Sequence, residues 1–119
     1  MRKRASRAYR LSRRADISRV FDKGRRACDE RITLLAAASD LPRCRLCVAV
    51  TKRHGMAVAR NRLKRVCREA FRLVRDELPG GRDYVILPHA GDALTLAGVQ
   101  ESLRALAPRV AGEDAVEGR

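Results

Sequence analysis

The sequence predicts an α/β fold in which helices pack on a sheet of three or four strands. Three observations lead to this prediction. Apolar residues recur with the helical period in three segments, they alternate or cluster as in strands in three others, and Gly, Pro or Asp residues separate the segments. A chain of 119 residues fits one modest core, so we expect residues 1–119 to form a single domain in the order α-β-β-α-β-α.

The first half of the chain predicts an arm, a short helix and two strands. Basic side chains crowd the N-terminus, so residues 1–11 are expected to be a flexible arm. A helix should follow, with Ser12 as its N-cap, Val20 on its apolar face and Gly24 as its stop. Residues 31–38 and 45–51 predict two strands, which a turn at 39–42 would join as an antiparallel hairpin.

The second half predicts two further helices around a third strand. A long helix is expected from about residue 56 to 78, where Pro and Gly residues at 79–81 end it. Residues 83–87 predict a strand that Pro88 stops, and Asp92 is placed to cap a last helix that carries Leu103 and Leu106. Residues 109–119 are expected to be a frayed tail.

Basic residues dominate the composition. Lysine and arginine number 27 against 14 acidic residues, a formal net charge of +13. Because the guanidinium fork of arginine holds phosphate oxygens bidentately, this excess predicts a nucleic-acid partner. No segment approaches the roughly 20 apolar residues of a spanning helix, and no signal peptide is recognisable. We therefore expect a cytoplasmic protein without a membrane partner, whose four cysteines are reduced thiols.

The long helix gathers the positive charge on one face. That face carries Arg60, Asn61, Lys64, Arg65, Arg68, Arg72 and Arg75. The opposite face is apolar and should pack on the sheet, with Leu63, Val66, Ala70, Leu73 and Val74 inside it and Cys67 and Phe71 at its border. Like charges four residues apart cost a few tenths of a kcal/mol per pair, so the face predicts phosphate binding more than simple solvation. Asn61 fits either an RNA contact or a plain surface role.

Two weaker patterns suggest a metal site and a nuclease site. Cys44 and Cys47 have a zinc-like spacing, but strand residues three apart point to opposite faces and no second pair follows, so no metal is expected. His54 and His89 could serve as acid and base of a self-sufficient nuclease, but their spacing is not diagnostic. No catalytic residue is predicted, and His54 is expected to contact phosphate.

The segment from residue 50 to 71 resembles the signature of the bacterial ribonuclease P protein subunit. The matching positions are Lys52, Arg53, Gly55, Ala57, Val58, Arg60, Asn61, Arg62, Lys64, Arg65, Arg68, Glu69 and Phe71. Arg10-Leu11, Val20-Phe21, Gly24 and Asp83-Tyr84 extend the likeness over nearly the whole chain. The resemblance implies an α/β sandwich with a small mixed sheet and a left-handed β-α-β crossover, related to the ribosomal protein S5 domain 2-like fold.

The resemblance also implies a function. Ribonuclease P removes the 5′ leader of precursor tRNA, and the chain would be the protein subunit of this endoribonuclease. The catalytic RNA, with Mg²⁺, would perform the phosphodiester hydrolysis. The implied partners are the catalytic RNA and precursor tRNA, with no cofactor bound by the protein alone and no small-molecule ligand. A generic RNA-binding or ribosomal protein without a role in cleavage is the alternative.

The family's two contact regions carry over to particular residues. Contact with the catalytic RNA falls to Lys52, Arg53, Arg60, Asn61, Arg62, Lys64, Arg65 and Arg68, with His54 in the adjoining turn. A cleft that holds the precursor leader falls to Ile17, Phe21 and Leu35. Ile17 stands where the family more often has an aromatic residue, and Leu35 replaces another. Because stacking contributes about 1–3 kcal/mol per base, leader contacts here should depend more on charge.

Overall fold

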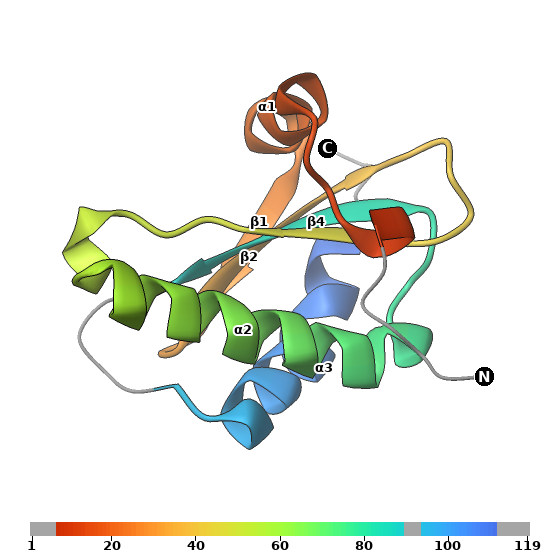
Figure 1. Ribbon diagram of the computed structural model, residues 1–119. Coiled ribbons are helices and arrows are strands. Elements are labelled where there is room, and N and C mark those ends of the chain that lie inside the picture. The colour runs from red at the N-terminus through yellow and green to blue at the C-terminus, as the bar shows by residue number, and fades with distance from the viewer. Residues whose placement is uncertain (1–6, 90–93, 112–119) are drawn as a thin grey trace.

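The computed structural model describes residues 7–89 and 94–111, which form three layers (Figure 1). The middle layer is a four-stranded sheet in the order β1-β2-β4-β3. Its strands are β1 (Arg25–Cys28), β2 (Ile32–Ala38), β3 (Arg45–Val48) and β4 (Arg82–Pro88). One face carries α1 (Arg14–Lys23), and the other carries α2 (Ala57–Val74) and α3 (Leu96–Ala111). The expected α/β sandwich with a small mixed sheet is confirmed.

The strand neighbours differ from those expected. β4 lies between β2 and β3, antiparallel to the first and parallel to the second, so the predicted hairpin of residues 31–38 and 45–51 is wrong. β2 instead forms an antiparallel hairpin with β1, a strand that the sequence analysis missed. The parallel strands β3 and β4 are connected through α2, which is the β-α-β unit that the family resemblance implies. The left-handed sense of that crossover stays a prediction.

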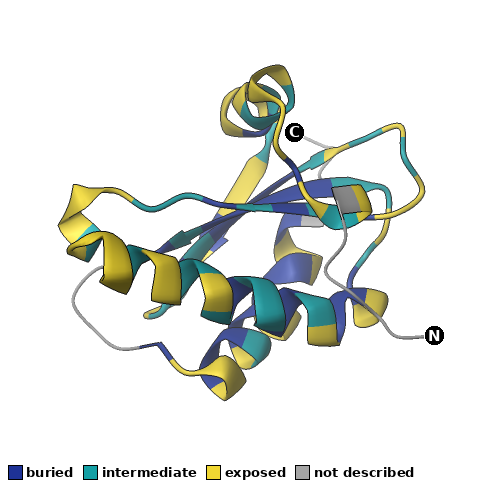
Figure 2. Cartoon of the chain, in the orientation of Figure 1, coloured by how far each residue is buried: buried dark blue, intermediate teal, exposed yellow. Residues whose placement is uncertain are grey.

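Each face of the sheet builds its own apolar cluster, because side chains alternate along the strands. The cluster under α2 and α3 is the larger, and its fully buried members include Ile32, Leu34, Tyr84, Ile86, Cys67, Val74, Val99 and Leu103. The cluster under α1 consists of Leu11, Val20, Leu35 and Val85, with half-buried neighbours. Figure 2 shows β2 and β4 largely buried, edge strand β1 largely exposed, and helices whose outer faces are exposed. The larger cluster fixes α2 on the sheet.

α1 begins later than expected but ends where expected. Its N-cap residue is Arg13, with no side-chain cap, so the predicted Ser12 cap is wrong. Gly24 ends the helix, and a β-carbon at this position would lie 2.7 Å from the carbonyl oxygen of Ala36. Only glycine therefore allows the end of α1 to approach β2 this closely.

The two ends of the chain are more ordered than expected within the described residues. Arg7–Tyr9 form a short 3₁₀ helix, and the N–H of Leu11 donates to the carbonyl of Leu46 at 2.9 Å. The prediction of a flexible arm is thus wrong for residues 7–11, and residues 1–6 lie outside the described part. α3 continues to Ala111, so the predicted fraying is wrong for residues 109–111. Asp92, the expected cap of α3, lies outside the described residues, as does 112–119.

α2 has the expected length, but its buried face is rotated. The helix runs to Val74 and tightens into a 3₁₀ turn, Arg75–Glu77, before the Pro-Gly-Gly segment. Its buried residues are Cys67, Ala70, Phe71 and Val74, whereas Leu73 is exposed. Cys67 and Phe71, which the sequence placed at the border of the apolar face, therefore lie at its centre. None of the helices in residues 7–89 and 94–111 has the length and hydropathy that crossing a bilayer requires.

Candidate RNA-binding interface

A turn at residues 51–55 positions the start of α2. The Thr51 hydroxyl accepts a hydrogen bond from the N–H of Arg53 at 3.2 Å, and the Thr51 N–H donates to His54 Nδ1 at 2.9 Å. Gly55 follows with a φ of 100°, a conformation that favours glycine. The chain therefore enters α2 in a fixed direction, with Lys52 and Arg53 exposed on the turn.

His54 ties this turn to the sheet instead of facing RNA. Its Nε2 lies 2.6 Å from the carbonyl oxygen of Pro88, which can only accept, while Nδ1 accepts from the N–H of Thr51. With Nε2 directed at a carbonyl and Nδ1 accepting from an N–H, both ring nitrogens are used. The predicted phosphate contact of His54 is therefore wrong in this conformation, and His54 acts by positioning Lys52 and Arg53.

His89 is also held by internal contacts. Its Nε2 lies 2.9 Å from the Thr33 hydroxyl, and its Nδ1 lies 3.3 Å from the carbonyl oxygen of Glu30. The two histidines that could have formed an acid and base pair are thus both engaged in holding loops and strand ends together. This arrangement gives no support to a self-sufficient nuclease.

The turn and the first half of α2 carry cations without carboxylate partners. Among residues 7–89 and 94–111, no ion pair involves the side chains of Lys52, Arg53, Arg60, Arg62, Lys64, Arg65 or Arg68. The Nε of Arg60 is moreover buried without a hydrogen-bond acceptor in this part of the chain. A buried donor without an acceptor is destabilising, and a phosphate oxygen would satisfy it.

Three of these cations, Lys64, Arg65 and Arg68, line an open hollow on the surface. Five residues of α2 line it, namely Asn61, Lys64, Arg65, Arg68 and Glu69, and its volume is about 410 Å³. A hollow of this size and charge can accept phosphate groups of an RNA backbone. Asn61 therefore lies among the cations, where its amide can donate to a phosphate or accept from a 2′-hydroxyl.

The basic face is shorter than the helical wheel indicated. Arg72 is paired with Glu69, whose carboxylate lies 2.6 Å from its NH2 group, and this hydrogen bond lowers the pKa of Glu69. Arg75 is only 6% exposed, and its guanidinium lies 3.5 Å from the centre of the Tyr9 ring. The series of unpaired cations spaced four residues apart, which begins at Arg60, therefore ends at Arg68 and does not include Arg72.

Two arginines on the opposite face of the sheet, Arg19 and Arg45, are paired with carboxylates. Asp83 of β4 is 0% exposed, and its carboxylate accepts two hydrogen bonds of 2.8 Å from Arg45 of β3. It also accepts one of 2.6 Å from Arg19 of α1. The hydrogen bond with Asp83 raises the pKa of Arg45. Arg19 thus attaches α1 to the sheet, and Arg45 joins β3 to β4 and lies 3.5 Å from Asp16 of α1, so neither is free to bind phosphate.

The three residues expected in the leader cleft lie in different environments. Phe21 is 41% exposed on α1, and Ile17 is half-buried one turn earlier. Leu35 is 1% exposed and belongs to the buried cluster that Ile17 packs against. The expectation that Leu35 touches the leader is therefore wrong in this conformation. Phe21 is the member of the set with an aromatic face accessible to a nucleotide.

The cysteines follow the geometry expected of a strand. Cys44 is buried toward α2, while Cys47 is half-buried on the α1 face, so the two thiols point to opposite faces as predicted. The four cysteines of the described part are free thiols. Burial between α2 and the sheet raises the pKa of Cys67 to about 12, which keeps this thiol protonated.

Comparison with known proteins identifies the family. The family model for ribonuclease P matches residues 5–111. The chain belongs to the ribonuclease P protein family. A ribonuclease P protein component from Desulfovibrio desulfuricans is 35% identical over 121 residues, which cover 94% of this chain and 93% of that protein. Another, from Oleidesulfovibrio alaskensis, is 41% identical over 85 residues, which cover 70% and 68%.

The fold agrees with the same family. The solved ribonuclease P protein from Thermotoga maritima superposes with a TM-score of 0.77 at 30% identity, covering 87% of this chain and 98% of that one. The chain is thus a tRNA-processing subunit of an endoribonuclease, and its ribonucleoprotein has an RNA partner. The generic RNA-binding alternative is disfavoured.

Sequence reasoning gave no site role to Tyr9 and Arg10, which also line a hollow beside α2. Arg10 matches the family resemblance, but it lies within a run of basic residues and nothing local indicates a contact with α2. Their backbone bridge to β3, between Arg10 and Leu46, is a long-range contact that periodicity does not reveal.

Proposed function

We propose that this subunit binds the catalytic RNA of ribonuclease P through the basic surface at the start of α2. The proposed contacts are Lys52, Arg53, Arg60, Asn61, Arg62, Lys64, Arg65 and Arg68. One observation carries the proposal: the seven cations of this set have no carboxylate partner in the described residues, although they are held on a rigid helix and turn. RNA phosphates would supply the missing negative charge.

The catalytic RNA, not the protein, performs the hydrolysis in this proposal, with Mg²⁺ bound at the RNA core. The engagement of His54 and His89 in internal hydrogen bonds supports this division, because neither is free as a general acid or base. The protein contributes binding and charge. It acts in the cytoplasm, as its free thiols also favour.

Precursor tRNA is the second proposed RNA partner. Phe21 offers an exposed aromatic ring on α1 for one leader nucleotide, with Ile17 beside it. By neutralising repulsion between two RNAs, the protein raises the affinity of the complex for precursor over mature tRNA and for Mg²⁺. Since salt screens the same repulsion, the protein should matter most at low ionic strength.

A cleavage assay tests this proposal. The purified protein is mixed with precursor tRNA at low Mg²⁺, with and without a bacterial ribonuclease P RNA. We expect no cleavage by the protein alone, and strong stimulation of cleavage by the RNA. Cleavage without the RNA would contradict the division of labour, and a lack of stimulation would contradict the subunit role.

A matched pair of variants extends the assay. Arg65→Ala removes one of the unpaired cations, whereas Arg104→Ala removes an arginine that is paired with Glu77 on the α3 side. Both lose one positive charge. Stimulation should require more protein for Arg65→Ala only. An equal effect of the two variants would mean that net charge, and not the position of Arg65, determines RNA binding.

A further inference from the structure

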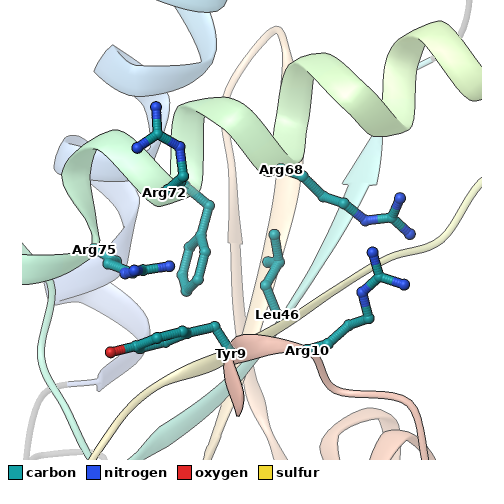
Figure 3. Close-up of a pocket in the computed structure, with 7 residues that line it drawn as sticks. Tyr9, Arg10, Leu46, Arg68, Arg72 and Arg75 are labelled. Atoms are coloured by element: carbon teal, nitrogen blue, oxygen red, sulfur yellow. The ribbon is translucent and has the colours of Figure 1, made fainter. Parts of the chain in front are cut away.

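A second, smaller hollow lies between the N-terminal segment and the C-terminal half of α2 (Figure 3). It is lined by Tyr9, Arg10, Leu46, Arg68, Phe71, Arg72 and Arg75. Its volume is about 30 Å³, room for about two water-sized atoms when one needs 10–15 Å³. The hollow can therefore take the oxygens of a phosphate group but not a nucleobase.

Two guanidinium groups face one another across this hollow. Figure 3 shows the side chain of Arg68 directed toward that of Arg10, while Arg72 turns away from both. Arg72 is neutralised by Glu69, but no acidic residue lines the hollow. Burial, and then the charge of Arg10, lowers the pKa of Arg68. The two facing charges are thus unfavourable in the free protein.

The backbone holds Arg10 in this position. On one side of it, Arg43 donates from Nε to the carbonyl of Ala8 at 2.5 Å, and the Tyr9 ring lies under the guanidinium of Arg75. On the other side, the buried Leu11 is hydrogen-bonded to Leu46 of β3. The N-terminal segment therefore cannot carry Arg10 away from Arg68 without breaking these contacts.

We propose that Arg10 and Arg68 clamp a single phosphodiester group of the bound RNA, so that the N-terminal segment and α2 hold the same strand. The inference rests on the proposed function, since it adds a contact to the same RNA. A guanidinium from each side offers two N–H donors to the non-bridging oxygens. The phosphate replaces a repulsion by two charge-assisted contacts, which is the physical reason for the arrangement.

A double-mutant cycle on the full chain tests the clamp. The affinity for ribonuclease P RNA is measured against salt for Arg10→Ala, Arg68→Ala and the double variant, with Arg104→Ala as the control of equal charge. One lost phosphate contact lowers the slope of log K against log salt by about 0.7–0.9. We expect each single variant to lose part of this amount, because the other arginine still contacts the phosphate, and the double variant to lose it about once.

The stability of the free protein gives an independent readout. Arg10→Ala should raise the melting temperature, since it removes the repulsion with Arg68, while RNA affinity falls. A role of Arg10 in folding alone would lower the melting temperature and leave the salt slope unchanged, which would overturn the clamp. Arg10→Lys should recover part of the affinity by restoring the charge.

Other outcomes would also overturn the clamp. A full loss of about 0.7–0.9 in each single variant, and of twice that in the double variant, would mean two separate phosphates. A melting temperature that rises with inorganic phosphate at constant ionic strength, together with RNA affinity independent of Arg10, would mean a site for free ions only. Failure of the wild-type protein to bind the RNA is a different result, which contradicts the proposed function itself.

Discussion

Two groups of arginines, one on each side of the sheet, have opposite roles. On the α1 side, Arg19 and Arg45 surround the buried carboxylate of Asp83. On the α2 side, the cations from Arg60 to Arg68 have no such partner in the described residues. The same type of side chain therefore stabilises the fold where a carboxylate is present and is available to bind an external anion where none is. The local partner, not the number of charges, distinguishes a structural arginine from a binding one.

The largest effect is expected from removing the carboxylate that Arg19 and Arg45 share. Asp83→Asn keeps the shape of the side chain but leaves Arg19 and Arg45 without their counter-charge. Removing one partner of a buried pair costs about 3–5 kcal/mol. We expect about 3 kcal/mol, the low end of that range, because the Arg19 side chain is 33% exposed. Urea unfolding measures the loss.

A control variant on the same helix isolates the pairing. Asp22→Asn removes an exposed carboxylate of α1 that forms no ion pair among the described residues. Its stability should change by less than about 0.5 kcal/mol. If Asp83→Asn were equally mild, Asp83 would not be what attaches α1 to the sheet.

The next largest effect is expected on the unpaired side. Arg65→Ala should weaken binding of ribonuclease P RNA about tenfold near 0.1 M salt, through the loss of one charge-assisted contact. Because Arg65 is exposed and unpaired in the described part, its removal should leave the free energy of unfolding within about 0.5 kcal/mol. Filter binding measures the RNA affinity, and urea unfolding measures the stability. A destabilised variant with normal RNA affinity would show that Arg65 has a structural role and does not contact RNA.

A smaller effect is expected at Glu69, where a paired arginine adjoins the unpaired cations of α2. Glu69→Gln removes the partner of Arg72 and a negative charge from the hollow, so RNA affinity should rise roughly twofold, a few tenths of a kcal/mol as expected for such helix pairs. Unchanged or weaker RNA binding by this variant would show that Arg72 is not a latent phosphate ligand.

The same pair predicts a dependence on pH. The hydrogen bond from Arg72 holds the pKa of Glu69 below its ordinary value of 4.5, so the pairing is present above that value and is lost as the pH falls through the lowered pKa. Titration of Glu69 should therefore add no pH dependence to the RNA affinity of the wild type between pH 5 and 8. Binding titrations of the wild type and Glu69→Gln across this window should stay parallel.

Some parts of the fold could be predicted from the sequence because their signals are local. The length of α2 followed from its helical period and the Pro-Gly-Gly stop, and the end of α1 followed from Gly24. β1 was missed because Arg25 and Arg26 carry no strand pattern, and the strand forms by pairing with β2. The place of β4 between β2 and β3 is a long-range property, so neighbours in sequence were wrongly paired.

The candidate site was predictable to a similar extent. The positions of Arg60, Lys64, Arg65 and Arg68 on one accessible face followed from helix geometry. His54, Leu35 and Arg75 were misjudged because their roles depend on contacts with Pro88, Val85 and Tyr9, each far away in the chain. Composition counts every arginine equally, and only the structure shows which ones have partners.

If the unpaired cations at the start of α2 bind RNA phosphates, RNA binding must depend steeply on salt. If the seven cations each contact one phosphate, log K for ribonuclease P RNA should fall against log salt with a slope of about −5 to −6. Alanine at Arg60, Lys64, Arg65 and Arg68 together should reduce the slope to about half. A wild-type slope near −1, or a slope that this fourfold variant leaves unchanged, would contradict the claim.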